Sequence, residues 1–125
     1  MKKIISTSNA PAAIGPYSQA VIVGGVLYAS GQIAIVPETG ELNLSNINAE
    51  IHQVMKNLEA VLSSAEMNFS NVVKCTIFLK DMNQYAEINA VYSQYFSDNP
   101  PAREAVQVSR LPKDVNVEIS LVAVA

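Results

Sequence analysis

The sequence is poor in the residues that build metal sites and disulfides. It has one cysteine, Cys75, one histidine, His52, and no tryptophan. A single cysteine cannot close an internal disulfide, which is typical of a protein in a reducing compartment. Because no second histidine or cysteine stands at metal-ligand spacing, we expect no zinc site and no other metal. We interpret Cys75 as a small buried residue of a strand and His52 as a surface residue of a helix.

The chain also lacks an excess of positive charge and any long hydrophobic run. Its 8 Lys and Arg residues stand against 11 Asp and Glu residues, which gives a formal net charge of −3. Proteins that bind nucleic acids usually show a basic patch, so this balance argues against such a partner. No apolar run of signal-peptide length follows the N-terminal lysines, and no segment approaches the roughly 20 apolar residues of a membrane helix. We therefore expect no nucleic-acid partner, no membrane association and a cytoplasmic location.

Hydrophobic residues, in contrast, are plentiful and patterned. They make up 50% of the 125 residues, which is enough for one core, while the length is too short for two domains. Their periodicity predicts the order strand, strand, helix, strand, helix, strand, strand after an extended segment at 1–16. This order favours an α+β fold in which residues 1–125 form a single domain, a mixed sheet with two helices on one face. The predicted segments are strands at 17–23, 26–33, 71–80, 102–109 and 115–124, a helix from Ser45 or Asn46 to Met67, and a helix that begins after Asp81.

The long helix and the strand after it each show one hydrophobic face. Five polar residues of the helix lie outside its stripe, namely Glu50, His52, Gln53, Lys56 and Glu59. The stripe itself consists of Ile47, Ile51, Val54, Met55, Leu58, Val61, Leu62 and Ala65. The apolar face of the strand consists of Val73, Cys75, Ile77 and Leu79.

The second helix is short and rich in aromatic residues. Asp81 is expected to cap it, with Gln84 placed to return a bond of the capping-box type. Asn89 lies beside the edge of the inward stripe, which consists of Tyr85, Ile88, Tyr92 and Tyr95. We interpret these aromatic side chains as core.

If both helices cover one face of the sheet, the other face has no cover within the chain. Its expected hydrophobic residues are Val21, Val23, Tyr28, Val122 and Val124. An apolar face that no helix covers is expected to meet another subunit, so the sequence predicts an oligomer.

Gly24-Gly25 predicts a tight hairpin in which Val23 lies opposite Val26. The polar residues that this register gathers on one face are Tyr17, Gln19, Ser30 and Gln32. Such a cluster is either a solvated edge or the floor of a site, and the hairpin alone leaves both interpretations open.

Arg103 is the most informative charged residue. Pro100-Pro101 ends the preceding helix, and the residues that follow alternate with period two. Arg103 shares a side with Ala105, Gln107 and Ser109, and the other side carries Ala102, Val106 and Val108. A guanidinium beside small, uncharged neighbours can grip a planar carboxylate with two parallel donors. Alternatively, Arg103 pairs with an internal acid such as Glu118 or caps a carbonyl group.

Taken together, these pieces resemble the RidA/YjgF family of small enamine/imine deaminases. The resemblance covers nearly the whole chain in order, and five motifs in sequence are much more specific than any one of them. The motifs are Ala13-Ile14-Gly15-Pro16-Tyr17-Ser18-Gln19-Ala20, Ser30-Gly31-Gln32-Ile33, Asp81-Met82-Asn83 followed by Asn89-Ala90-Val91-Tyr92, Pro101-Ala102-Arg103, and Leu111-Pro112-Lys113 ahead of Val117-Glu118-Ile119.

The resemblance implies a chorismate-mutase-like fold and a homotrimer whose sheets line a central barrel, with sites in clefts between subunits. It implies hydrolysis of reactive enamines and imines, 2-iminobutanoate and 2-iminopropanoate, to 2-oxo acids and ammonia without a cofactor. The alternative is a non-catalytic regulatory protein that binds small 2-oxo acids in the same clefts. RNA cleavage, a third idea attached to relatives, is disfavoured by the acidic balance and the absence of a histidine pair.

The resemblance also implies roles for single residues. Arg103 would bind the substrate carboxylate, Glu118 would orient or activate the attacking water, and the main-chain carbonyl of Ala105 would accept the iminium N–H. The residues expected to line the cleft are Tyr17, Ser30, Gly31 and Asn89. Many members have Ser and Cys where this chain has Glu104 and Ala105, and an aromatic residue where it has Pro100. The last difference affects the pocket wall.

Overall fold

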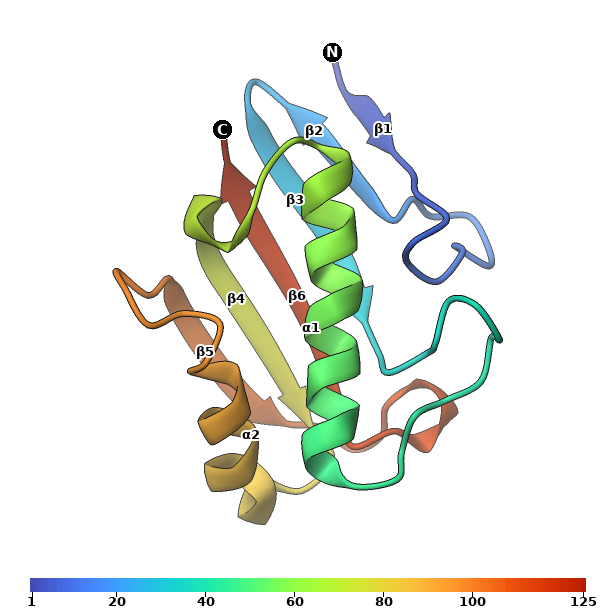
Figure 1. The fold of residues 1–125 in the computed structure, drawn as a ribbon, viewed down its shortest axis with the longest axis vertical. Helices are drawn as coiled ribbons and strands as arrows, with labels where there is room; N and C mark the ends of the chain where they lie inside the picture. Colours follow the sequence, from blue (N-terminus) through green and yellow to red (C-terminus); the bar gives the residue numbers. More distant parts are fainter.

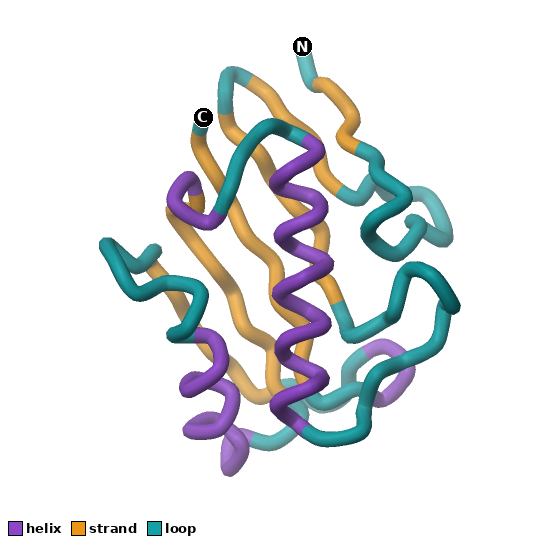
Figure 2. The backbone as a smooth tube through the Cα atoms, in the orientation of Figure 1, coloured by secondary structure: helices purple, strands orange, loops and turns teal.

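The computed structural model describes residues 1–125, which fold into one sheet with two α-helices on the same face (Figure 1). The elements are β1 (Lys3–Ile5), β2 (Ala20–Val23), β3 (Val26–Gln32), α1 (Ile47–Ser64), β4 (Val72–Leu79), α2 (Tyr85–Tyr92), β5 (Ala102–Gln107) and β6 (Val117–Val124). The sheet order is β1-β2-β3-β6-β4-β5, in which only β4 and β5 are parallel. The predicted α+β class and the two helices on one face are confirmed, and β1 is an edge strand that the sequence did not predict (Figure 2).

The β2–β3 hairpin has the predicted turn and register. Gly24 and Gly25 take φ values of 57° and 77°, a left-handed pair that suits a two-residue hairpin. Val23 pairs with Val26 as predicted. The register breaks farther along β3, because the pairing with β6 shifts by one residue between Ala29 and Gln32.

The hydrophobic stripe of α1 is confirmed, and the helix begins after Asn46. The backbone N–H of Ala49 donates to Asn46 Oδ1 at 2.8 Å, which settles the cap in favour of Asn46 over Ser45. The fully buried residues of the helix include Ile51, Val54, Met55, Leu58, Val61 and Leu62. Two polar residues outside the stripe, Glu50 and Gln53, are also buried, so the buried surface of α1 is wider than its hydrophobic pattern indicates.

Glu50 joins the first turn of α1 to the start of β6. Its carboxylate accepts the backbone N–H of Asn116 at 2.8 Å, the side-chain amide of Asn116 at 2.7 Å and the backbone N–H of Val117 at 3.2 Å. Buried polar groups need such partners, and a negative charge is also favoured at a helix N-terminus. This contact fixes the strand that carries Glu118.

Two local predictions were wrong. A one-residue shift between Val72 and Lys74 puts Val72 in the core and leaves Val73 47% exposed, although Cys75 is fully buried as predicted. Asp81 caps the short 3₁₀ turn Met82–Gln84 rather than α2 itself. Gln84 makes no capping-box bond.

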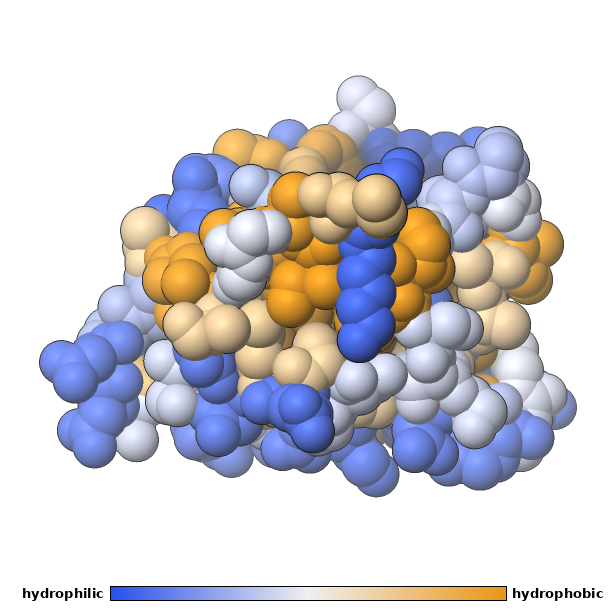
Figure 3. All heavy atoms as spheres, turned by 90° about the horizontal axis from the view of Figure 1, so that it is seen from above, coloured by the Kyte–Doolittle hydropathy of each residue, from blue (hydrophilic) through white to orange (hydrophobic).

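The sheet face away from the helices is open and partly apolar. Its exposed or half-buried hydrophobic residues include the five expected ones, Val21, Val23, Tyr28, Val122 and Val124. Viewed from the end that carries both termini, hydrophobic side chains gather centrally and hydrophilic ones surround them (Figure 3). Neither helix is long and apolar enough to cross a membrane.

Candidate functional site

Arg103 points to the helix-covered side of the sheet, where α2 holds it. Its pairing partner in β4 is the core residue Cys75. Nη1 donates to Asn89 Oδ1 at 2.7 Å, and Nη2 donates to the hydroxyl oxygen of Tyr85. Cζ lies 4.9 Å from the ring centroid of Tyr92 and 5.5 Å from that of Tyr85. The three α2 residues stand at i, i+4 and i+7, and therefore form one row along the helix.

The guanidinium of Arg103 has no acidic partner. The two ion pairs of the chain, Lys74–Glu104 and Lys80–Asp114, do not include it. Of the five N–H donors of a guanidinium, two are bonded, so three (5 − 2) have no partner. A half-buried cation with unused donors is suited to bind a planar anion.

A cleft of about 440 Å³ opens at Arg103, between the end of α2 and the start of β5. Its walls include Asn89, Tyr92, Pro100 and Pro101. Pro100, which stands where many members of the resembled family have an aromatic residue, therefore forms part of this wall.

Glu118 lies in a second cleft of about 500 Å³ on the open side of the sheet. The carboxyl group is half-buried and accepts no hydrogen bond from the chain. This burial raises the pKa of Glu118 above the usual value for glutamate. The other residues of the cleft include Tyr17, Ser30, Gly31 and Lys113.

Gly31 makes room for the Glu118 carboxyl group. A Cβ atom at Gly31 would lie 2.1 Å from Oε2 and 2.9 Å from Cδ of Glu118. Gly31 belongs to the shifted segment between Ala29 and Gln32, which turns bare backbone toward the carboxyl group. Any side chain at this position would push Glu118 aside.

Arg103 and Glu118 lie on opposite faces of the sheet. Arg103 is paired with Cys75, and Glu118 is paired with Phe78, three residues farther along β4. Successive strand residues point to alternate faces, so a separation of three puts the two side chains on different sides. The alternative that Arg103 pairs with Glu118 inside the chain is therefore wrong.

The polar residues of the hairpin line the Glu118 cleft. Tyr17 precedes β2, and its hydroxyl accepts the N–H of Ile14 at 3.3 Å. Ser30 bonds the carbonyl of Ser18 at 2.6 Å. Gln32 pairs with a core-facing residue after the register shift, so its predicted placement on the same face as Ser30 was wrong.

Gln19 has a structural task at the cleft. Its side-chain amide donates to the carbonyls of Thr7, Ala10 and Pro11, and its Oε1 accepts the N–H of Thr7 at 2.7 Å. It thereby fixes the N-terminal segment that forms one wall.

The two residues after Arg103 that differ from many members of the resembled family, Glu104 and Ala105, lie on opposite faces of the sheet. Ala105 lies on the Arg103 side and is half-buried, whereas Glu104 lies on the open face. Glu104 accepts a hydrogen bond from Thr76 at 2.6 Å and pairs with Lys74 at 3.0 Å, and these contacts lower its pKa. Glu104 therefore does not alter the surroundings of Arg103.

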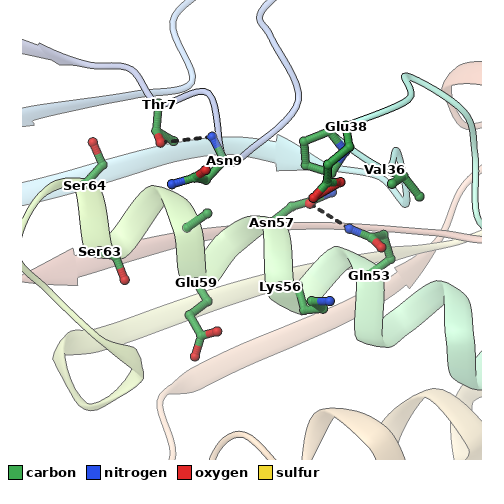
Figure 4. Close-up of a pocket in the computed structure, with 12 residues that line it drawn as sticks. Thr7, Asn9, Val36, Glu38, Gln53, Lys56, Asn57, Glu59, Ser63 and Ser64 are labelled. Carbon is green, nitrogen blue, oxygen red and sulfur yellow. Dashed lines mark hydrogen bonds between the residues drawn. The ribbon is translucent and has the colours of Figure 1, made fainter.

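A third hollow, of about 490 Å³, runs along α1 beside the loops at 7–9 and 36–38 (Figure 4). Its deepest polar groups are bonded within the chain. Asn57 donates to the carbonyls of Ile33 and Ile35, and Gln53 donates to Asn57 Oδ1 at 3.0 Å. The groove contains none of the expected site residues, and its amides serve to anchor the loop after β3.

The single histidine and the single cysteine both make contacts inside the fold. His52 is half-buried, not on the surface as expected, and its Nδ1 lies 2.6 Å from the hydroxyl of Tyr95. Burial raises the pKa of the Cys75 thiol, which keeps it protonated. No three His, Cys, Asp or Glu side chains come together as a metal site.

Two residues, one that contacts Arg103 and one that lines the Glu118 cleft, had no assigned role in the sequence. Tyr85 was interpreted as core, although its hydroxyl contacts Arg103. Lys113 stands in a quoted motif without a role, and the structure places it at the Glu118 cleft with a left-handed φ of 56°. The spacing of Tyr85 and Asn89, one helical turn apart, was the available signal for the first.

Residues 7–125 match the family model described as Endoribonuclease L-PSP. Among curated proteins, the chain is 46% identical over 124 residues to the human 2-iminobutanoate/2-iminopropanoate deaminase, covering 99% of this chain and 90% of that protein.

Two solved structures give the same fold. YyfA from Yersinia pestis, described as a member of the conserved Rid protein family, matches with a TM-score of 0.96 and 46% identity, covering 100% of both chains. The E. coli protein TdcF, solved with bound serine, matches with a TM-score of 0.94 and 41% identity, covering 98% of both chains.

Proposed function

Because the chain belongs to the Endoribonuclease L-PSP family, the RidA/YjgF family that its motifs resemble, we propose that it hydrolyses small 2-imino acids. The substrates would be 2-iminobutanoate, 2-iminopropanoate and their enamine forms, and the products 2-oxo acids and ammonia. The observation that carries the proposal is a guanidinium, that of Arg103, which is held by neutral groups and lacks a counter-ion.

The carboxylate of a 2-imino acid would bind the free donors of Arg103. Charge-assisted hydrogen bonds of this kind contribute about 1.5–3 kcal/mol each when they are shielded from water. The relative solved with bound serine supports a ligand of this size, since serine also carries a carboxylate and a nitrogen on the neighbouring carbon.

Glu118 would act as the base. It takes a proton from water while the water oxygen bonds to the carbon of the protonated C=N group, whose π electrons pass to the nitrogen, and this gives a carbinolamine. Glu118 then returns the proton to the amino nitrogen, the C–N bond breaks, and the hydroxyl proton leaves with the departing ammonia as ammonium, so water is the only co-reactant. The raised pKa of Glu118 suits this task, because a carboxylate that resists losing its proton also accepts one more readily. The carbonyl of Ala105 remains our proposed acceptor for the iminium N–H.

The opposite placement of Arg103 and Glu118 supports a site built from two chains. We propose a homotrimer of chorismate-mutase-like subunits, in which the open sheet faces line a central barrel and the Glu118 cleft of one chain meets the Arg103 cleft of the next. Tyr17, Ser30 and Gly31 would then lie across from Asn89 of the neighbour. The exposed apolar side chains of the open face support such an assembly. We also propose a cytoplasmic location, which the single buried cysteine supports.

The test is to generate 2-iminobutanoate in solution with a threonine dehydratase and to follow its decay with and without this protein. We expect faster decay and a matching rise in 2-oxobutanoate. No acceleration, combined with binding of 2-oxobutanoate, would favour the non-catalytic regulatory alternative. Light scattering coupled to size exclusion should report three times 13.4 kDa, and a monomer at micromolar concentration would contradict the shared site.

A further inference from the structure

We infer that Tyr85 is a specificity-determining residue, which orients the Arg103 guanidinium and adds a hydrogen-bond donor of its own for the ligand carboxylate. The inference rests on the proposed function in taking a small carboxylate as the ligand. It assigns a task to a hydroxyl group that the hydrophobic pattern of α2 attributes to the core.

The direction of the Tyr85–Arg103 hydrogen bond leaves a proton available. A guanidinium has no acceptor, so the hydroxyl oxygen of Tyr85 accepts from Nη2. A phenol also has one O–H donor, and this hydroxyl makes no other bond in the chain. The O–H is therefore free to donate beside the guanidinium. Together with the three free N–H groups of Arg103, it gives a fourth donor, which lies next to Nη2 of the guanidinium.

The position of Tyr85 is fixed by the strand that carries Arg103. The backbone N–H of Met82 donates to Gln107 Oε1 at 2.8 Å, which joins the turn before α2 to the end of β5. Asp81 closes the same turn by accepting the N–H of Asn83 at 2.9 Å. Because Tyr85 begins α2 directly after this turn, the contact between the turn and β5 determines where the Tyr85 side chain starts relative to Arg103.

The side chains that hold the Arg103 guanidinium are neutral, and this determines which ligands it can bind. Tyr85, Asn89 and Tyr92 restrict the guanidinium without cancelling its charge, whereas a carboxylate at any of these places would occupy the donors. A held cation with an adjacent hydroxyl prefers an anionic planar group to a neutral one of the same shape. We therefore expect the site to distinguish a 2-oxo acid from its neutral amide, and this distinction to depend on the Tyr85 hydroxyl.

The test compares Tyr85→Phe with Tyr95→Phe in the assembled protein. Both changes remove one bonded hydroxyl and keep the ring, but the Tyr95 hydroxyl bonds His52 and does not touch Arg103. Binding of 2-oxobutanoate and of 2-oxobutanamide is measured by calorimetry, and KM and kcat are measured for 2-iminobutanoate. Arginine-labelled protein reports the rotation of the Arg103 Nη groups by ¹⁵N NMR.

For Tyr85→Phe we expect the Kd of 2-oxobutanoate and the KM to rise about tenfold, as for one lost hydrogen bond to a charged group. The affinity for 2-oxobutanamide should change little, and kcat should stay within about twofold because the Glu118 chemistry is untouched. The two ¹⁵N signals of the Arg103 Nη groups should merge into one, because the guanidinium rotates more freely. Tyr95→Phe should match the wild type in all of these.

Other results would overturn the inference or separate it from the proposed function. Unchanged carboxylate binding in Tyr85→Phe, an equal loss for the acid and the amide, or a fall in kcat alone would overturn the inference. A wild type that binds no 2-oxo acid would overturn it as well. If the wild type binds 2-oxobutanoate tenfold more tightly than Tyr85→Phe but hydrolyses no imine, the inference stands and the proposed function fails.

Discussion

Arg103 and Glu118 occupy opposite faces of one sheet, and their surroundings differ as much as their charges. Arg103 is held by two hydrogen-bond acceptors and two aromatic rings. Glu118 accepts no hydrogen bond from the chain, and burial opposes its charge. Arg103 is restrained by its contacts, whereas Glu118 fits because Gly31 beside it has no side chain.

This difference matches two distinct chemical tasks. A charge that binds a ligand must stay charged and stay in place, which hydrogen bonds and ring contacts ensure. A group that takes up a proton works best when its charged form is not over-stabilised, because its pKa then lies closer to the working pH. The comparison predicts that substitutions on the two faces separate binding from chemistry.

The largest effect should follow from Glu118→Gln. Glutamine keeps the shape but cannot take a proton, so kcat for 2-iminobutanoate should fall about 100-fold or more, while 2-oxobutanoate binds as well or better. The matched control is Glu104→Gln, which changes an exposed carboxylate on the same face. Unchanged turnover in Glu118→Gln would remove the base from the mechanism.

A smaller loss is expected for Arg103→Lys. An ammonium provides a point charge without parallel donors, so kcat/KM should fall roughly 30-fold, equivalent to about 2 kcal/mol. The melting temperature should change little, because the guanidinium faces a cleft rather than the core. Arg110→Lys, at an exposed position, is the control. A destabilised variant with normal kinetics would show that Arg103 has only a structural role.

Gly31→Ala should act through Glu118. The added methyl group displaces the carboxyl group from its place, and a shift of this size should lower kcat about tenfold. The informative comparison is the double variant with Glu118→Gln, measured in the same kinetic assay. If Gly31→Ala lowers kcat further in the absence of the Glu118 carboxylate, the contact between the two residues does not explain its effect.

The smallest predicted effect concerns stability and pH. The folded state binds the Glu118 proton more tightly than the unfolded chain does, so this contribution to stability is present below the ordinary glutamate pKa and is lost as pH rises through the raised value. Glu118→Gln should therefore melt slightly above the wild type at pH 7, and the two should converge near pH 4. Melting curves at both pH values measure this; a wild type that melts higher at pH 7 would contradict it.

Much of the fold follows from local patterns. Gly24-Gly25 predicts the hairpin because two left-handed residues are needed there, and the apolar spacing of α1 predicts which side it buries. These features depend on neighbours in sequence. The family resemblance named Arg103, Glu118, Gly31 and Asn89 as site residues, and the structure places each of them at or beside one of two clefts.

What the sequence did not predict depends on partners far along the chain. The shifts at Ser30–Gly31 and at Val73 each insert one residue into a strand, and period-two patterns carry no mark of such an insertion. Glu50 is buried because backbone N–H groups of β6 and the residue before it, 66 and 67 positions away, need an acceptor. That Arg103 and Glu118 lie on opposite faces of the sheet becomes clear only from the pairing of both strands with β4.

The contact between Gly31 and Glu118 also constrains how this chain can change over evolutionary time. While residue 118 is a glutamate in this rotamer, every substitution at position 31 collides with its carboxyl oxygen at 2.1 Å. Once residue 118 becomes smaller, a side chain at position 31 meets no carboxyl oxygen, and a glutamate that later returns at 118 has to place its carboxyl group elsewhere. Descendants that lose the acid at position 118 should therefore vary at position 31, and those that keep the acid in this rotamer should keep glycine there.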